Sequence, residues 1–409
     1  MSDLALGRRL MDRLEALARF SDDVDGLTRL YLSPSHKRAA DTIAGWMREV
    51  GLAVRLDALG TLIGHYEGQT AGAPALLVGS HIDTVRHAGK YDGALGVLAA
   101  LTAVEALSQA GEHLPFAIEV IAFGDEEGVR FPSTLRGSRA LAGTLDPATL
   151  DERDADGTSV RDALREFGAD PEHRAEAAIS RSAALGFIEV HIEQGPVLER
   201  MGQPLGVVTA INGARRLGVR VQGTAGHAGT TPMNMRRDSL AAAAEMVIAV
   251  ERCAAEMRDV VATVGMIEAR PGAANVIPGE TRFTIDARAP DDAARDHVIS
   301  RIERAIEGIA ARRGIAVELR EMHNASATAC DPKLMAGLDD AARAAGFAPV
   351  HLPSGAGHDA MSMAALCPVA MLFVRCAGGI SHHPAEAISL EDADAAVCVL
   401  LNFLRAYKP

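Results

Sequence analysis

Cysteine is scarce in this sequence and follows no pattern that would build a disulfide framework or a thiolate metal site. The five cysteines are odd in number, and no two have the Cys-x-x-Cys spacing. Secreted disulfide-rich domains use paired cysteines, and thiolate zinc sites use closely spaced ones. We therefore expect free thiols and a reducing, cytoplasmic location.

Membrane-spanning runs and an excess of positive charge are also missing. No apolar stretch reaches the roughly 20 residues that cross a bilayer, and residues 1–25 are rich in charge, which predicts an amphipathic helix and not a signal peptide. The formal net charge is −13. Because nucleic acids and anionic membranes attract basic surfaces, we expect neither as the main partner.

The sequence does have enough apolar residues for a large core. Of 409 residues, 48% are hydrophobic and 23% are charged, which is the balance of a globular protein. This length exceeds the usual size of a single core and favours two domains.

Strands and helices are predicted to alternate along most of the chain. The predicted helices are residues 37–49, 94–109, 332–345 and 390–407. The predicted strands lie around Ala53 and Leu62 and at residues 75–80, 116–124, 186–190 and 369–374. This alternation favours an α/β domain of three layers, in which ligands gather at strand ends along one edge of the sheet.

The pattern changes in the middle of the chain to a single β-α-β-β-α-β set. Its predicted strands are residues 217–221, 260–268, 281–288 and 315–319, and its predicted helices are residues 239–257 and 291–313. This set predicts an inserted α+β domain of ferredoxin-like type. We expect residues 213–327 to form the insert, and residues 1–212 and 328–409 to form the main domain.

Three adjacent carboxylates follow the apolar run at residues 116–124. Asp125, Glu126 and Glu127 would repel one another and lose solvation beside a buried strand, so a cation is expected among them. A metal ion is the simplest candidate. Because neighbouring side chains point in different directions, one of the two glutamates could bind the metal while the other handles a proton.

Other polar residues lie at or near strand ends. His81 and Asp83 end the run at residues 75–80, and Asp92 precedes the helix predicted at 94–109. A lone His-x-Asp is more often a polar turn, and Asp92 could be a helix N-cap. At a metal site, Asp83 would accept a hydrogen bond from the imidazole nitrogen that faces away from the metal, and Asp92 could bridge two cations.

Two further histidines complete the pattern. His191 follows the strand predicted at 186–190, and His382 lies in the segment Ser-His-His-Pro-Ala-Glu. Lone histidines in such places are usually structural, but four such sites in one domain indicate a metal-assisted active site. In the insert, Arg288 could pair with Asp286 or clamp a substrate carboxylate.

With these residues the chain resembles the metallopeptidase and amidase clan of the aminoacylases and carboxypeptidase G. It is most similar to the hydantoinase/carbamoylase branch, which holds N-carbamoyl-L-amino acid hydrolase, allantoate amidohydrolase and β-ureidopropionase. The matching blocks span nearly the whole chain, at residues 80–84, 91–93, 125–127, 191–195, 226–232, 354–359 and 381–382. The resemblance implies a metallopeptidase-like catalytic domain with an inserted lid and dimerisation domain.

The resemblance also implies the metal ligands and the base. Two divalent ions, of zinc, manganese, cobalt or nickel, would be held by His81, Asp92, Glu127, His191 and His382. Asp92 would bridge the ions, and Glu126 would be the general base. The choice of His382 over His383 rests on its spacing of four before Glu386, which matches the clan.

Substrate contacts are implied in the same way. Arg288 would hold the substrate carboxylate, and His227, lent by the partner subunit of a homodimer, would polarise the scissile carbonyl. Other candidates for substrate binding are Asn275, Arg216, Gln194, Gly357 and His358. Many relatives have a Gln-Thr pair before the arginine that corresponds to Arg216, whereas this sequence has Asn-Gly-Ala-Arg at residues 212–215. This difference affects the local substrate contacts.

These features predict a metal-dependent amidohydrolase that cleaves the ureido C–N bond of N-carbamoyl-L-amino acids or allantoate and releases carbon dioxide and ammonia. Aminopeptidases of the clan usually have an acidic ligand at the position of His191. The histidine here therefore favours the hydantoinase/carbamoylase branch. Two alternatives stay open. One is a dipeptidase or aminoacylase of the same clan, and the other is a metal-bearing dimer that binds ureido compounds without turnover. A solvated acidic surface without metal is a third interpretation of the carboxylates.

Overall fold

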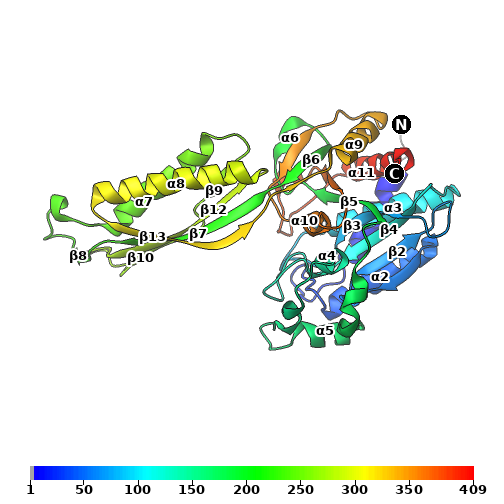
Figure 1. The fold of residues 1–409 in the computed structure, drawn as a ribbon, viewed down its shortest axis with the longest axis horizontal. Helices are drawn as coiled ribbons and strands as arrows, with labels where there is room; N and C mark the ends of the chain where they lie inside the picture. The colour runs from blue at the N-terminus through cyan, green and yellow to red at the C-terminus, as the bar shows by residue number, and fades with distance from the viewer. Residues whose placement is uncertain (1–3) are drawn as a thin grey trace. The chain divides into compact units, whose positions relative to one another are not determined.

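The computed structural model describes residues 4–409, which divide into two compact units (Figure 1). Unit 1 is assigned Met1–Thr209, Cys330–Leu352 and Gly357–Pro409, and unit 2 comprises Ala210–Ala329 and Pro353–Ala356. The part of the helix prediction that falls on residues 1–3 lies outside the described residues. The boundaries of these units differ from the domain boundaries predicted from the sequence, which fall after residues 212 and 327. Residues 353–356 join unit 2 because Ser354 and Gly355 accept hydrogen bonds from Asn212 and Arg288.

Unit 1 is built on a large mixed sheet with the strand order β1-β2-β4-β3-β5-β16-β6 (Figure 1). Its strands are β1 Ala53–Leu56, β2 Leu62–Tyr66, β3 Ala75–His81, β4 Ala117–Phe123, β5 Ala184–Ile192, β6 Leu205–Ile211 and β16 Val369–Val374. The short strands β14 Thr328–Ala329 and β15 His351–Ser354 both pair with β6. Strands β4, β3, β5 and β16 are mutually parallel. Their carboxyl ends therefore meet at one edge of the sheet.

The helices of unit 1 cover this sheet. They are α1 Ala5–Leu17, α2 Pro34–Val50, α3 Ala94–Gln109, α4 Arg136–Leu141, α5 Val160–Phe167, α6 Val197–Met201, α9 Pro332–Ala344, α10 Asp359–Met363 and α11 Leu390–Ala406. Helix α3 is buried on nearly every side because it packs on β3, β4 and β5 and also on α1 and α11. Within residues 4–409, no helix combines the length and the apolar character needed to cross a bilayer.

Helix α2 starts three residues earlier than predicted. Ser33 is its N-cap and accepts a hydrogen bond from the His36 backbone N–H, while Pro34 takes the first helical position. Proline is well suited to that position because its fixed φ is helical and no N–H is needed there. The helix ends at Gly51, whose positive φ supplies the left-handed cap.

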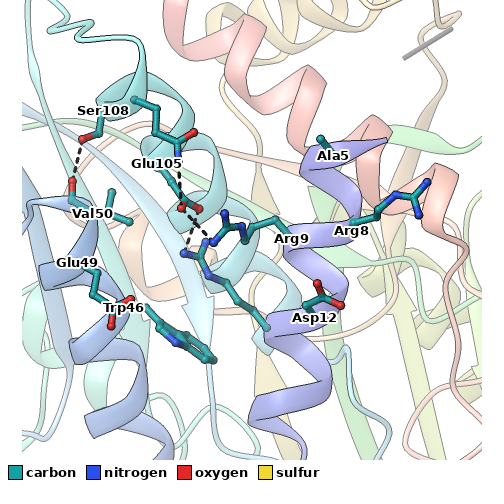
Figure 2. Close-up of a pocket in the computed structure, with 11 residues that line it drawn as sticks. Ala5, Arg8, Arg9, Asp12, Trp46, Glu49, Val50, Glu105 and Ser108 are labelled. Carbon is teal, nitrogen blue, oxygen red and sulfur yellow. Dashed lines mark hydrogen bonds and ion pairs between the residues drawn. The ribbon is translucent and has the colours of Figure 1, made fainter. Parts of the chain in front are cut away.

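A cavity of about 630 Å³ lies between α1, α2 and α3 (Figure 2). Arg9 and Arg13 from α1 turn toward Glu105 of α3, with ion-pair distances of 3.4 and 3.0 Å. The guanidinium of Arg13 also lies 5.8 Å from the ring centroid of Trp46. These contacts tie the N-terminal helix to the domain. None of the predicted site residues lines this cavity.

Unit 2 has a five-stranded sheet with the order β10-β12-β7-β13, and β9 pairs with β12. Its strands are β7 Gly213–Gln222, β9 Val261–Thr263, β10 Ile267–Arg270, β12 Glu280–Ala289 and β13 Ala316–Ala325. Helices α7 Ser239–Ala255 and α8 Asp292–Arg313 lie along one face of this sheet (Figure 1). Buried Leu217, Val219 and Val221 alternate with the less buried Gly218 and Arg220 because only one face of the strand packs on the helices. A separate two-stranded sheet joins β8 Gly226–His227 to β11 Val276–Ile277.

The strand predicted over residues 260–268 is interrupted in the structure. Strand β9 pairs with β12 at Asp286–Arg288, whereas β10 pairs with β12 at Glu280–Phe283. Gly265 lies in the gap between β9 and β10. Glycine weakens a strand interior, which accounts for a break that the apolar pattern alone did not reveal.

Candidate metal centre

The carboxyl ends of the parallel strands carry the candidate metal ligands of unit 1. His81 is the last residue of β3, and Glu126 and Glu127 follow β4. His191 lies near the end of β5, and the loop after β16 contains His382. The strands run parallel and are hydrogen-bonded neighbours, so these residues gather at one sheet edge.

Asp92 lies at the centre of this group. Its Oδ1 is 3.5 Å from His81 Nε2 and 3.1 Å from His191 Nε2. Its Oδ2 is 3.2 Å from His382 Nε2, which is also 3.7 Å from Glu127 Oε2. The two oxygens of one carboxylate therefore face two different groups of side chains.

Three sets of side chains place potential ligand atoms within 4.8 Å of one another. They are His81, Asp92 and His191; Asp92, Glu127 and His382; and His81, Glu126 and Glu127. The first two sets share only Asp92 and together contain all five predicted ligands. That arrangement suits a carboxylate between two cations.

The residues present fit such cations. His81, Asp92 and His191 are at most 3% exposed. Although His191 Nε2 lies close to Asp92, this atom and Glu127 Oε1 are buried without a hydrogen-bond partner among the described residues. Buried polar atoms without partners are costly and rare, and a bound ion would satisfy both. Imidazole nitrogen and carboxylate oxygen together form a common donor set for zinc and other transition metals.

The ionisation of the carboxyls follows from the same surroundings. Burial raises the pKa of Glu126 well above its ordinary value and raises that of Glu127 to about 7. Burial also opposes the charge on Asp92, but its contacts with His191, His382 and His81 outweigh burial and hold the pKa of Asp92 well below the ordinary value. Imidazole nitrogens close to both of its oxygens stabilise the charged form of Asp92, and a bound cation would stabilise it in the same way.

The two buried imidazoles are oriented by main-chain oxygens. His81 Nδ1 lies 3.0 Å from the carbonyl oxygen of Asp83, and His191 Nδ1 lies 2.9 Å from that of Ile192. A carbonyl only accepts hydrogen bonds, so Nδ1 carries the proton in both rings. The Nε2 atoms that face Asp92 are therefore the basic nitrogens.

Asp83 acts differently from the role predicted for its carboxylate. The carboxylate oxygen is 3.7 Å from His81 Nδ1, beyond hydrogen-bond distance, because the carbonyl of the same residue takes that position. The carboxylate instead accepts the backbone N–H groups of Glu126 and Glu127, both at 3.2 Å. Asp83 thereby fixes the backbone of the loop that holds both glutamates.

Glu386 is a site residue that sequence reasoning did not single out. Its carboxylate accepts the backbone N–H groups of Tyr91 and Asp92 at 2.9 and 3.1 Å and the hydroxyl of Ser381 at 3.1 Å. It connects the loop of Asp92 to the loop of His382. Its position four residues after His382 could have indicated a role at the site. In the sequence, that spacing was used only to choose His382 over His383 as a metal ligand.

The backbone is strained beside several of these residues. Asp125, Gln194 and His382 have positive φ angles of 72°, 57° and 55°. Residues other than glycine adopt such angles at an energetic cost, and they cluster at functional sites. Asp125 is held by an ion pair with Arg136, and both side chains are fully buried. The N-cap of α3 is Gly93, so the alternative role of Asp92 as the cap is wrong.

The other predicted residues of unit 1 lie beside this centre. Gln194 Nε2 donates to Asp92 Oδ2 at 3.1 Å. The ring centroid of His358 is 4.5 Å from that of His191. A Cβ built on Gly357 would be 3.7 Å from Glu126 Oε1.

The remaining predicted residues belong to unit 2 and form two groups. The backbone N–H of Ala228, next to His227, donates to the carbonyl of Asn275, so those two predicted residues lie on neighbouring segments. Arg216 and Arg288 both form ion pairs with Asp286. The pairing of Arg288 with Asp286 that the sequence left open is therefore present.

Gly93 provides a test of how closely His81 is packed. Its φ is 65°, and a Cβ at this position would lie 2.4 Å from His81 Cε1. We expect Gly93→Ala to displace the imidazole and lower metal affinity on the order of 10-fold or more, as for changes that disturb ligand orientation. Competition with a chromophoric chelator measures the affinity.

Gly111→Ala is the matched control, because Gly111 also has a φ of 65° but open space where the Cβ would lie. It places an alanine at the same positive φ far from any candidate ligand. Equal losses of metal affinity in the two variants, or none in Gly93→Ala, would contradict the packing described here.

Comparisons with known proteins identify the family of this chain. The profile of Peptidase family M20/M25/M40 matches residues 77–406. The chain is 42% identical over 425 residues to a protein of Arabidopsis thaliana named allantoate deiminase, with 96% of this chain and 81% of that protein covered. It is 41% identical over 397 residues to an N-carbamoyl-L-amino acid amidohydrolase of Geobacillus stearothermophilus, with 97% of each covered.

A solved structure is similar over the same extent. It is the crystal structure of an amidase of the hydantoinase/carbamoylase family from Burkholderia multivorans, with a TM-score of 0.93 and 34% identity over 98% of both chains. The chain therefore belongs to Peptidase family M20/M25/M40 and, within it, to the hydantoinase/carbamoylase amidases.

Proposed function

We propose that this protein is a metal-dependent amidohydrolase that cleaves the ureido C–N bond of N-carbamoyl-L-amino acids or allantoate. Carbamate release and its decay to carbon dioxide and ammonia make the step effectively irreversible. The observation that carries the proposal is the buried group of histidines and carboxylates around Asp92, with Glu126 beside it. Relatives at 41–42% identity named for these two substrates support the choice of reaction.

The proposed cofactor is a pair of divalent ions, of zinc, manganese, cobalt or nickel. His81, Asp92 and His191 would hold one ion, and Asp92, Glu127 and His382 would hold the other. Such ions, when bound, polarise a carbonyl and lower the pKa of water. The unpartnered Nε2 of His191 and Oε1 of Glu127 support this assignment.

Glu126 is the proposed general base. Its Oε2 lies 4.0 Å from His81 Nε2, and burial raises its pKa well above the ordinary value. A carboxylate with a raised pKa takes a proton from water more readily and can later give it up to the departing nitrogen. The backbone hydrogen bond to Asp83 holds Glu126 in place for both transfers.

Unit 2 is proposed to supply substrate contacts as an inserted ferredoxin-like lid and dimerisation domain. Arg288 would hold the substrate carboxylate with help from Arg216, and Asn275 would contact the substrate. His227, lent by the partner in a homodimer, would polarise the scissile carbonyl. In unit 1, the proposed substrate contacts are Gln194, Gly357 and His358. All five cysteines are free thiols, which supports a cytoplasmic location.

A substrate panel tests the reaction class. We expect ammonia release from allantoate, from N-carbamoyl-L-amino acids of varied side chain or from N-carbamoyl-β-alanine, with metal-reconstituted protein. N-acetyl amino acids and dipeptides should be poor substrates. Faster turnover of these amides would favour the dipeptidase or aminoacylase alternative, and no turnover of any compound would favour a binding protein.

Glu126→Gln tests the base. We expect kcat to fall by at least ~10²-fold, the low end for acid–base catalysis, while metal content and melting temperature stay unchanged. Glu193→Gln is the control, because Glu193 is also a buried carboxylate, and its hydrogen bonds within residues 4–409 are from the backbone N–H groups of Val197 and Leu198. A turnover number near that of the wild type in Glu126→Gln would refute the assignment.

Arg288→Ala tests the carboxylate contact. We expect KM for carboxylate-bearing substrates to rise by roughly 10-fold or more, because truncating one partner of a charged hydrogen-bonded pair removes that binding energy. Arg220→Ala is the control, since Arg220 lies on the same sheet and pairs with Glu280. An unchanged KM in Arg288→Ala would show that the clamp lies elsewhere.

A further inference from the structure

Unit 2 contains a cavity of about 580 Å³ with only three charged side chains in its lining. These are Arg216, Asp286 and Arg288, and the other lining residues are uncharged. Phe283, Ile285 and Ala287 pack with the helices of unit 2 on the opposite face. The charged residues therefore lie on the face of the sheet that α7 and α8 do not cover.

The sequence places Asp286 between the two arginines. Side chains alternate along a strand, so Asp286 and Arg288 of β12 point to the same face. The antiparallel register of β12 and β7 sets Arg216 directly opposite Asp286. One carboxylate thus has an arginine two positions along its own strand and another across the sheet.

Asp286 binds both guanidinium groups. Arg288 donates from Nε to Oδ1 at 2.8 Å and from Nη2 to Oδ2 at 3.1 Å. Arg216 donates from Nε to Oδ2 at 2.8 Å. Partial burial raises the pKa of Asp286, but these hydrogen bonds outweigh burial and leave the pKa below its ordinary value. The carboxylate is therefore charged at neutral pH.

The arginines keep donors free for a ligand. Arg288 has five N–H groups, of which two bind Asp286 and one on Nη1 donates to the carbonyl of Gly355 at 2.7 Å. One N–H remains on each terminal nitrogen, and both can donate to a ligand carboxylate. Among the described residues, the terminal nitrogens of Arg216 have no hydrogen-bond partner.

The charges in this lining leave room for one anion. Two guanidinium groups and one carboxylate give a single net positive charge, which one ligand carboxylate neutralises. A second ligand carboxylate would face Asp286 with no uncompensated cation in the lining. Like charges at short range across a binding surface are strongly unfavourable.

We propose that Asp286 is a specificity-determining residue that limits this cavity to substrates with a single carboxylate. Allantoate and N-carbamoyl-L-amino acids with uncharged side chains belong to this class, and N-carbamoyl dicarboxylates do not. The inference rests on the proposed function, in which Arg288 holds the substrate carboxylate.

The test compares two substrates of nearly the same shape, N-carbamoyl-L-aspartate and N-carbamoyl-L-asparagine. In metal-loaded Asp286→Asn protein, a second guanidinium becomes available to the extra carboxylate. The ratio of kcat/KM for the aspartate compound over the asparagine compound should rise at least 10-fold above the wild-type ratio. An unchanged ratio overturns the proposal. Asp286→Ser repeats the test if the melting temperature shows that the Asn variant is misfolded.

Glu280→Gln is a closely matched control. Glu280 lies on the same face of β12 and likewise accepts from two arginines, Arg220 at 2.6 Å and Arg282 at 2.9 Å. It does not line this cavity. The substitution removes the same charge outside the cavity. The substrate ratio should therefore stay within twofold of the wild-type value. An equal rise in both variants would assign the effect to net charge and overturn the proposal.

A binding measurement separates this inference from the proposed function. Calorimetry on metal-loaded Glu126→Gln protein, with and without Asp286→Asn, gives Kd for the two carbamoyl compounds while turnover is slowed at least ~10²-fold. The preference for the asparagine compound should weaken at least 10-fold when Asp286 is replaced. If wild-type protein releases no ammonia from any compound of the substrate panel, the proposed function fails, whereas an unchanged Kd ratio overturns the role of Asp286 separately.

Discussion

The burial of several like charges at one sheet edge is the constraint on which the rest of this structure depends. Asp92, Glu126 and Glu127 are close together and largely removed from water. Carboxylates in such a place either stay protonated or gather positive partners. The protein does both, since the pKa of Glu126 is raised by burial while three histidines surround Asp92. The proposed hydrolytic centre combines both features, with a pair of metal ions held by these ligands and Glu126 as the group that takes up a proton.

Buried polar residues around the centre hold the loops that carry these carboxylates. Asp83 fixes the backbone of Glu126 and Glu127, Glu386 fixes that of Asp92, and Arg136 holds Asp125 in its left-handed conformation. Each of these three residues is at most 5% exposed. Binding sites need such support because a ligand displaced by a fraction of an ångström loses its geometry. The strand ends provide position, and these polar contacts provide orientation.

The sequence revealed the frame of unit 1 because buried parallel strands appear as continuous apolar runs. Strand β16 and helix α3 have the predicted bounds, whereas β6 and β15 were missed. The bonds from Glu386 to Tyr91 and Asp92 cross more than 290 residues of sequence and depend on tertiary structure that no local pattern encodes. The opposition of Arg216 and Asp286 likewise follows from strand register, which the sequence does not state. Grouping the five metal ligands relied on the family resemblance, since lone histidines have common structural roles.

Anomalous X-ray diffraction from crystals grown with zinc tests the central claim most directly. Two anomalous peaks are expected in each chain, one on either side of the Asp92 carboxylate, with His81 and His191 beside one peak and Glu127 and His382 beside the other. Empty density between these side chains in zinc-saturated crystals would contradict the claim.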